Sequence, residues 1–312
     1  MKLAFLGTPA FAVPSLEALA REGYTIPAVF TQPDRPKGRG QQLAISPVKE
    51  AALRLGLTVY QPERIKRPEQ VELLRSFGLD AMVVVGYGQI ISQAIIDLVP
   101  LGIINVHASL LPKYRGAAPI QWAIANGEMR TGVTTMRIDA GLDTGDMLLK
   151  AETDIGPEET SPELSARLAE MGAALLIDTM RGLAAGTIEP EKQDHAQHSL
   201  APILKKEDGL IDWRWPAARI HARIRGFQPW PVCYTTFRGQ TLHIWGAAVT
   251  QAEGAPGTLL LPDRKRLLVA CGEGTALELR EVQVQGRNRV DAASFRNGQR
   301  IVDNERLGES AS

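Results

Sequence analysis

Over the first 150 residues, short apolar runs alternate with segments in which apolar residues recur every three or four positions. The run Ala81–Val85 is purely apolar, as expected of a strand that a parallel sheet buries on both faces. Ser46 and Pro47 open an amphipathic segment in the manner of an N-cap and a first helical residue. This alternation predicts an α/β fold with a Rossmann-like, doubly wound, mostly parallel sheet. We expect strands at 2–6, 26–31, 59–61, 81–85 and 102–106, and helices at 14–22, 46–55, 68–77, 92–98 and 116–126.

The pattern changes towards the C-terminus. Two antiparallel strands at 132–138 and 145–152 and a long amphipathic helix at 161–184 complete the first part. After a short helix, apolar runs separated by Gly, Pro or Asp predict a small, OB-like antiparallel β-barrel. We therefore expect a catalytic domain at 1–189, a polar linker at 190–206 and a barrel domain at 207–312. The barrel strands are expected at 232–237, 241–249, 257–261, 267–271 and 276–284.

Composition excludes several classes of protein. The 312 residues are 44% hydrophobic and 22% charged with a formal net charge of +0, which is ordinary for a soluble globular protein. Cys233 and Cys271 lack the spacing of a metal site and are interpreted as small buried hydrophobes. Since no apolar run has the length of a membrane span or a signal peptide, we expect a cytoplasmic protein without membrane contact.

Two polar side chains follow one another at alternate positions where the strand at 102–106 ends. Asn105 and His107 would share a face, because alternate residues of a strand point the same way. Sites in doubly wound sheets lie at the carboxyl ends of the strands. An amide donor beside an imidazole can hold a developing oxyanion and manage a proton, which indicates acyl transfer. Taken singly, a structural histidine and a turn asparagine are the alternative interpretations.

A glycine-punctuated loop at 139–146 carries three acids, Asp139, Asp143 and Asp146. One of them could orient His107 and raise its basicity, as the third member of a triad does. Spacing alone does not select among the three, and a tight turn with solvated acids is the alternative. The ligand pattern of an EF-hand is absent.

Two further loops would lie beside the same edge of the sheet. The first strand-to-helix turn has a single glycine, Gly7, which argues against a dinucleotide site. Phe11 there either lines an apolar substrate pocket or packs on the domain. The long loop at 31–43 carries Arg35, Lys37 and Arg39 against only Asp34, which suits a nucleic acid end. A solvated flexible loop is the alternative.

These motifs resemble a known family. Asn105-Val106-His107, the following Ser-Leu-Leu-Pro at 109–112, and Gly-Leu-Asp-Thr-Gly-Asp at 141–146 look like the signature of the folate-dependent formyltransferases. The loop Phe30–Pro36 with Gly38-Arg39-Gly40 is similar to that of the branch that acts on tRNA. So are the runs 114–121, 211–213 and 229–231.

The resemblance implies an activity and a set of site residues. A formyl group would pass from 10-formyltetrahydrofolate, without a metal, to the α-amine of methionine on initiator tRNA. Asn105 and an N–H of His107 would stabilise the oxyanion, and Asp143 would keep His107 in the useful tautomer. The C-terminal domain would support the tRNA, and we expect a monomer. The folate site would include Ser109, Leu110, Leu111 and Pro112, with the pterin at Tyr87, Gly88, Gln89 and Ile90; the methionyl-tRNA would contact Phe11, Arg35, Lys37 and Arg39.

Three other functions fit parts of the pattern. A formyltransferase acting on the amine of a nucleotide-linked sugar shares the catalytic motif and can carry a second barrel domain. A folate-binding hydrolase would release formate, with water in place of the amine. A nucleic-acid-binding protein with a degenerate enzyme domain is disfavoured, because the set Asn105, His107 and Asp143 is complete.

Overall fold

The computed structural model describes residues 1–37 and 42–308 of the chain. It comprises two compact units. The first unit contains residues 1–117, 130–153 and 165–201, and the second contains 118–129, 154–164 and 202–312. Within the described parts of the chain, no helix has both the length and the apolarity to cross a membrane.

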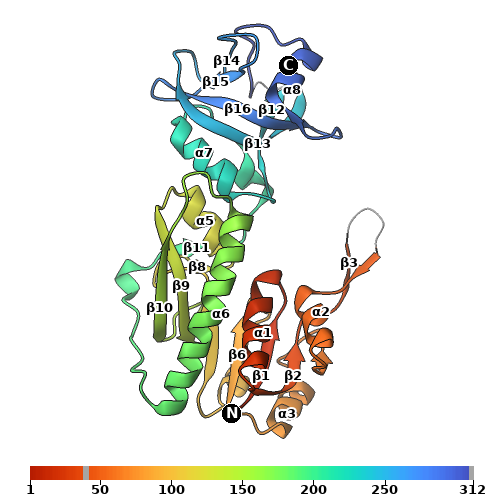
Figure 1. The fold of residues 1–312 in the computed structure, drawn as a ribbon, viewed down its shortest axis with the longest axis vertical. Coiled ribbons are helices and arrows are strands. Elements are labelled where there is room, and N and C mark those ends of the chain that lie inside the picture. The colour runs from red at the N-terminus through yellow and green to blue at the C-terminus, as the bar shows by residue number, and fades with distance from the viewer. Residues whose placement is uncertain (38–41, 309–312) are drawn as a thin grey trace. The chain divides into compact units, whose positions relative to one another are not determined.

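The first unit is built on a seven-stranded sheet in the order β10-β9-β7-β6-β1-β2-β5 (Figure 1). Strands β7, β6, β1, β2 and β5 run parallel, and β9 is antiparallel to β7. This confirms the predicted Rossmann-like, mostly parallel sheet. The strands are β1 (Lys2–Gly7), β2 (Thr25–Phe30), β5 (Val59–Tyr60), β6 (Ala81–Val85), β7 (Ile103–His107), β9 (Arg130–Arg137) and β10 (Met147–Asp154).

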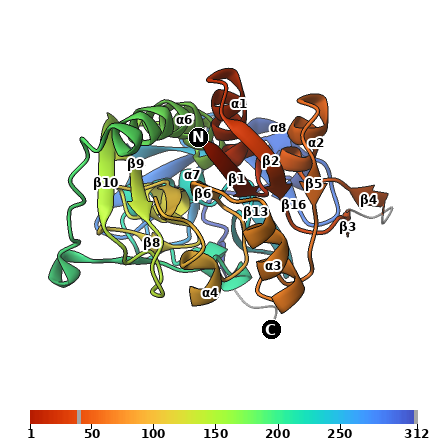
Figure 2. The same cartoon turned by 90° about the horizontal axis from the view of Figure 1, so that it is seen from below.

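Helices cover both faces of this sheet. Helices α1 and α6 lie on one face, and α3 and α4 lie on the other (Figure 2). All five residues of β6 and of β7 are buried, because helices pack on the sheet from both sides. The helices of this unit are α1 (Val13–Arg21), α2 (Pro47–Arg54), α3 (Pro68–Ser76), α4 (Gln93–Ile96) and most of α6 (Ser161–Ala185), with the short 3-10 helices η1 (Ala10–Ala12) and η2 (His195–Gln197).

The structure adds strands that the sequence pattern did not indicate. The expected helix at 116–126 begins only at Pro119, because the chain first forms β8 (Arg115–Gly116). This strand pairs in parallel with β11 (Leu200–Ala201), from the segment expected to be a linker. Strands β3 (Arg35–Lys37) and β4 (Gln42–Ala44) pair within the long basic loop. Strands of two or three residues show no alternation, so periodicity cannot detect them.

The second unit contains an antiparallel sheet in the order β12-β13-β16-β15-β14, with β17 beside β16. This sheet forms a half-barrel, in agreement with the predicted small barrel. Phe227 is fully buried in its core, and burial raises the pKa of the Cys233 and Cys271 thiols to about 12, which confirms them as inert buried groups. The elements are α5 (Pro119–Ala125), η3 (Lys206–Gly209), α7 (Ala217–Gly226), β12 (Cys233–Phe237), β13 (Gln240–Gln251), β14 (Leu259–Leu260), β15 (Leu268–Ala270), β16 (Thr275–Val284), β17 (Val290–Asp291) and α8 (Ala292–Gln299).

Candidate active site

Strand β7 carries the first two predicted site residues to the carboxyl edge of the parallel sheet. Asn105 and His107 are 9% and 6% exposed, and their alternation along the strand places them on one face. Among the residues that the structure describes, none hydrogen-bonds the Asn105 carboxamide. A buried amide without a protein partner is free to donate a hydrogen bond to a bound substrate.

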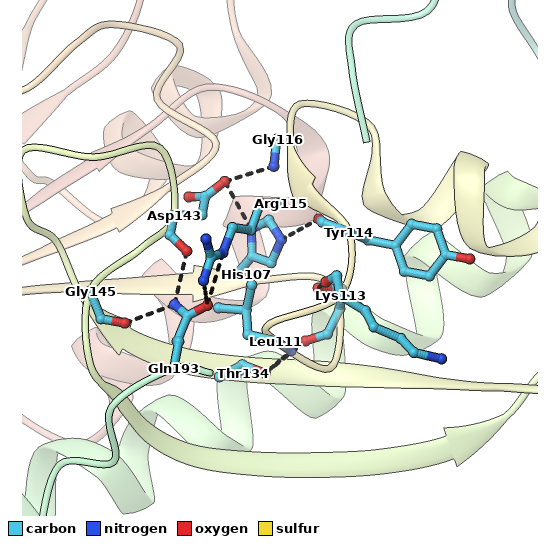
Figure 3. A network of polar contacts seen from close by, with 11 residues as sticks. His107, Leu111, Lys113, Tyr114, Arg115, Gly116, Thr134, Asp143, Gly145 and Gln193 are labelled. Carbon is cyan, nitrogen blue, oxygen red and sulfur yellow. Dashed lines mark hydrogen bonds and ion pairs between the residues drawn. The ribbon is translucent and has the colours of Figure 1, made fainter. Parts of the chain in front are cut away.

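The imidazole of His107 is held between two protein oxygens (Figure 3). Its Nε2 lies 2.9 Å from the main-chain carbonyl oxygen of Tyr114, and its Nδ1 lies 3.8 Å from Oδ2 of Asp143. A carbonyl oxygen can only accept, so we assign the proton to Nε2. In the neutral ring, Nδ1 is therefore the basic nitrogen. Tyr114, and not Asp143 as expected from the resemblance, provides the hydrogen bond that selects the tautomer.

Asp143 is the acid that the fold brings to the imidazole. Its φ of 51° lies in the left-handed region, and its Oδ2 accepts a 2.8 Å hydrogen bond from the Gly116 N–H. Asp139 instead caps its own loop, accepting from the Gly141 N–H and the Thr144 hydroxyl. Within the described chain, Asp143 is the loop acid that forms an ion-pair contact with His107. Spacing had left this choice open.

A second layer holds the loop of Asp143 in place. Nε2 of Gln193 donates to the main-chain oxygens of Asp143 and Gly145, both at 2.8 Å. Oε1 of Gln193 accepts from Nε and Nη2 of Arg115, at 3.0 and 2.7 Å (Figure 3). Both side chains are buried, at 5% and 4% exposure. The sequence predicted neither as a site residue: Arg115 appeared only within the run 114–121 that carries the resemblance, and Gln193 lies in the predicted linker.

Hydrogen bonds of Ser109 and Thr134 hold the turn after β7 in place. Ser109 donates through its hydroxyl to the Lys113 carbonyl at 2.6 Å, and the Thr134 hydroxyl bridges the Ser109 carbonyl and the Leu111 N–H. Ser109 and Leu111 are buried, whereas Leu110 and Pro112 are partly exposed. Of the four residues predicted to border the folate, Leu110 and Pro112 therefore offer apolar surface, and the other two shape the turn.

The segment after β6 exposes its main chain and one apolar side chain, that of Ile90, which is 81% exposed. The Gln89 carboxamide is bound to the protein, donating to the Pro62 carbonyl and accepting from the Ile65 N–H. Tyr87 is buried, which raises the pKa of its hydroxyl. Across residues 1–37 and 42–308, no partner hydrogen-bonds the main-chain N–H and C=O groups of residues 88–90. These main-chain groups fit the predicted recognition of a flat heterocycle edge.

The residues predicted to contact the second substrate are placed in part. Phe11 lies in η1, partly buried, and Arg35 is exposed at the start of β3. Lys37 ends β3, and Arg39 lies outside the described residues. The base of this loop is anchored by Asp34, which forms an ion pair with Lys49 and accepts from Gln61 at 2.7 Å. These hydrogen bonds, from Lys49 first, hold the pKa of the Asp34 carboxyl below its ordinary value.

The site combines a free carboxamide, an imidazole with one basic nitrogen and a carboxylate within ion-pair distance. Such a set can stabilise an oxyanion and transfer a proton. In the described part of the chain, no three His, Cys, Asp or Glu side chains gather as a metal site.

Comparison with known proteins identifies the class. Residues 1–180 match the family described as Formyl transferase, and residues 203–300 match its C-terminal domain. The chain belongs to the formyl transferase family. It is 68% identical over 311 residues to the methionyl-tRNA formyltransferase of Solibacter usitatus, covering 99% of each chain. It is 57% identical over 313 residues to the methionyl-tRNA formyltransferase of Koribacter versatilis, covering 100% of each.

A solved structure supports the fold. The N-formyltransferase of Helicobacter canadensis, in complex with folinic acid and dTDP-3-aminofucose, superimposes with a TM-score of 0.67. The match covers 89% of this chain and 98% of that chain at 19% identity. At this identity the comparison bears on the fold alone.

Proposed function

We propose that this protein transfers the formyl group of 10-formyltetrahydrofolate to the α-amine of methionine esterified to initiator tRNA. The observation that carries the proposal is the contact of His107 Nδ1 with Asp143 Oδ2 beside the unpartnered carboxamide of Asn105. The full-length likeness to the two methionyl-tRNA formyltransferases supports the choice of acceptor.

The chemistry follows from the tautomer of His107. The neutral amine attacks the formyl carbon, forming a C–N bond while the carbonyl π electrons move to oxygen. The Asn105 amide donates to this oxyanion, because its N–H groups have no partner in the protein. The amine proton passes to Nδ1 of His107, since Nε2 already carries a proton that it donates to Tyr114. The resulting imidazolium faces the Asp143 carboxylate at 3.8 Å, which stabilises the charge.

Collapse of the intermediate returns the proton. The carbonyl re-forms, the bond to N10 of the folate breaks, and Nδ1 of His107 protonates the departing nitrogen. The products are formylated amine and tetrahydrofolate, so one proton moves from amine to N10 with no net change. His107 thus acts first as base and then as acid. This differs from the sequence expectation, in which a His107 N–H shares the oxyanion.

The donor site is proposed along β6 and the turn after β7. Free main-chain groups at 88–90 would bind the hydrogen-bonding edge of the pterin, and Leu110 and Pro112 would contact its ring. On the acceptor side, Phe11 would contact the methionyl side chain. Arg35, Lys37 and Arg39 would contact phosphates near the end of the tRNA, because cations on a loop beside the site suit a polyanion.

Transfer of labelled formyl from 10-formyltetrahydrofolate tests the proposal. Acceptors would be methionyl initiator tRNA, uncharged tRNA and a nucleotide-linked amino sugar. We expect acid-precipitable label on methionyl-tRNA alone, and labelling about 10²–10⁴-fold slower with the Asp143→Asn variant. Label on the amino sugar in place of the tRNA would establish the alternative acceptor. Release of free formate at the same rate without any amine would indicate a hydrolase.

A further inference from the structure

Gln193 lies far from the reacting groups in sequence, but its carboxamide holds the backbone of the loop that carries Asp143. It is 50 positions from Asp143 along the chain and is 5% exposed. We propose that Gln193, oriented by Arg115, is a positioning residue that sets the place of the Asp143 carboxylate against His107. The inference rests on the function proposed above, because it assigns how the same site is held.

The contacts of Gln193 require both halves of a carboxamide. Its Nε2 donates to two main-chain oxygens, of Asp143 and Gly145, and its Oε1 accepts from two nitrogens of Arg115. Carbonyl oxygens only accept and a guanidinium only donates, so the amide has one permitted orientation. Glutamate would turn a carboxylate oxygen towards the two carbonyl oxygens. An apolar side chain would leave these carbonyls and the Arg115 nitrogens without their hydrogen-bond partner.

Arg115 fixes that orientation. Arg115 is 4% exposed, and among the described residues no carboxylate lies within ion-pair distance of its guanidinium. The guanidinium hydrogen-bonds Gln193 and, from Nη1 at 3.2 Å, Nδ1 of His195. A buried guanidinium must be fully hydrogen-bonded, so Arg115 holds the Gln193 oxygen strongly and leaves only Nε2 for the loop.

The neighbours of Arg115 in the chain contact the imidazole and the carboxylate directly. The Tyr114 carbonyl accepts from His107, and the Gly116 N–H donates to the Asp143 carboxylate. Arg115 stands between them and reaches the Asp143 main chain through Gln193. The main chain of Tyr114 and of Gly116, on either side of Arg115, thus contacts both groups. The buried side chain of Arg115 connects this segment to the Asp143 loop through Gln193. This arrangement fixes the 3.8 Å separation between Nδ1 and Oδ2.

The left-handed conformation of Asp143 explains why the loop needs this restraint. A φ of 51° is disfavoured for a residue with a side chain, so the surrounding structure must maintain it. The Gln193 hydrogen bonds to the carbonyls of Asp143 and Gly145 lie on either side of Thr144. Without them, we expect the loop to relax and the carboxylate to move away from Nδ1.

The test uses Gln193→Met in the full-length protein, with Gln197→Met as the matched control. Gln197 is exposed in η2 of the same segment, and its amide donates to Asp194. We expect Gln193→Met to lower kcat by about 10²-fold, the scale of a 1 Å misplacement, with little change in KM for the folate donor. Gln197→Met should retain wild-type kinetics. A kcat for Gln193→Met close to that of the control would overturn the inference.

A double-mutant cycle with Asp143→Asn separates positioning from general stability. If Gln193 acts through Asp143, then adding Gln193→Met to Asp143→Asn causes no further loss of kcat. A merely structural residue would lower activity by the same factor in both backgrounds, and that additive result would contradict the inference. Gln193→Glu, which keeps the size and the acceptor for Arg115, provides the same cycle if the Met variant does not fold.

Hydrogen exchange provides a readout that needs no substrate. In Gln193→Met, amides of residues 139–146 should exchange faster than in wild type, while those of β6 and β7 keep their protection. If wild type fails to formylate methionyl-tRNA while this local change occurs, the proposed function is wrong and the positioning role stands. Unchanged amide exchange rates in residues 139–146 would contradict the positioning role, whatever the substrate.

Discussion

His107 has both ring nitrogens directed at protein atoms, whereas the carboxamide of Asn105 has no partner among the described residues. This difference indicates separate roles for the two residues. We propose that the imidazole moves the proton, oriented by Tyr114 and Asp143, and that the carboxamide holds the oxyanion. Each role predicts a separate kinetic outcome.

Asn105→Ala removes the oxyanion donor. We expect kcat to fall by about 10²–10³-fold, because one such donor is worth that factor in comparable sites. Folate affinity should change little, since the interaction strengthens in the transition state. Steady-state kinetics and equilibrium folate binding measure the two effects, with the exposed Asn288→Ala as control. Equal losses in kcat and in folate affinity would contradict the role.

Asp143→Asn removes a charge while keeping an oxygen that can accept from Gly116. We expect kcat to fall by about 10²–10⁴-fold, the usual contribution of acid–base catalysis, because the imidazolium loses its counter-ion. Asp146→Asn, in the same loop, is the matched control and should stay near wild type. The reverse ranking of the two variants would show that the wrong acid has been assigned.

The stability of strand β9 and of helix α7 depends on one residue in each. In β9, a Cβ on Gly132 would lie 2.0 Å from the main-chain oxygen of Ala151. In α7, His221 is buried beside Arg225 and Glu158, with its Nε2 3.4 Å from the Glu158 carboxylate. Gly132 leaves no room for a side chain in the sheet, and His221 makes the stability of α7 depend on pH.

Gly132→Ala should destabilise the first unit. The clash is with backbone, which cannot rotate away, so we expect a loss of about 3 kcal/mol, at the upper end for overpacking. Gly298→Ala is the control, because a Cβ there meets nothing within 4 Å and lies in helix α8. It should be neutral or stabilising by up to about 1 kcal/mol. Urea unfolding followed by circular dichroism compares them; equal stabilities would refute the packing argument.

Acid should destabilise the second unit through His221. Burial, and secondly Arg225, lower the pKa of this imidazole below its ordinary 6.5. The unfolded chain therefore binds the proton more readily, so the contribution to stability is present above pH 6.5 and is lost as pH falls through the folded pKa. His221→Gln should flatten the dependence of unfolding free energy on pH between 7.5 and 5.5, about the range in which histidine titrates.

Tryptophan fluorescence measures this effect selectively. All five tryptophans of the chain lie at positions 122, 213, 215, 230 and 245, within the second unit. Urea midpoints read by fluorescence therefore report the unit that contains His221. A wild-type stability that rises on acidification in this range, or a variant with the same slope as wild type, would contradict the assignment.

For the molecule as a whole, the two substrates should respond differently to salt. Net charge is +0, so attraction of a polyanion must come from local groups such as Arg35, Lys37 and Arg39. If these side chains contact three phosphates, raising salt from about 50 to 200 mM should increase KM for tRNA more than tenfold. The affinity falls because the free energy gained by releasing counterions decreases as salt rises. KM for the folate donor should hardly change.

Arg35→Ala should reduce the slope of log KM against log salt by about 1, the contribution of one phosphate contact. Arg21→Ala is the control: it ends helix α1, away from the carboxyl edge of the sheet. An unchanged slope in Arg35→Ala would remove this residue from the tRNA contact, without affecting the catalytic argument.

Much of the fold could be predicted because its elements carry local signals. The apolar run 81–85 became β6, and Ser46 caps α2 by accepting from the Lys49 N–H, as its position before Pro47 indicated. Asn105 and His107 could be paired because alternation on one strand is a local property. The choice of Asp143 among three acids came only from the resemblance, since loop conformation has no periodic signal.

By itself, then, the sequence determined the layered α/β unit, the antiparallel sheet that follows it and the family of the site, because periodicity, caps and motifs act over a few residues. Only the tertiary structure decided that Tyr114 selects the tautomer of His107 and that Arg115 and Gln193 enclose the Asp143 loop. The contacts of Gln193 join residues 50 and 78 positions apart, and that of Tyr114 spans the turn that follows β7. Buried polar groups find their partners only after the backbone has closed around them, so no local pattern can encode the pairing.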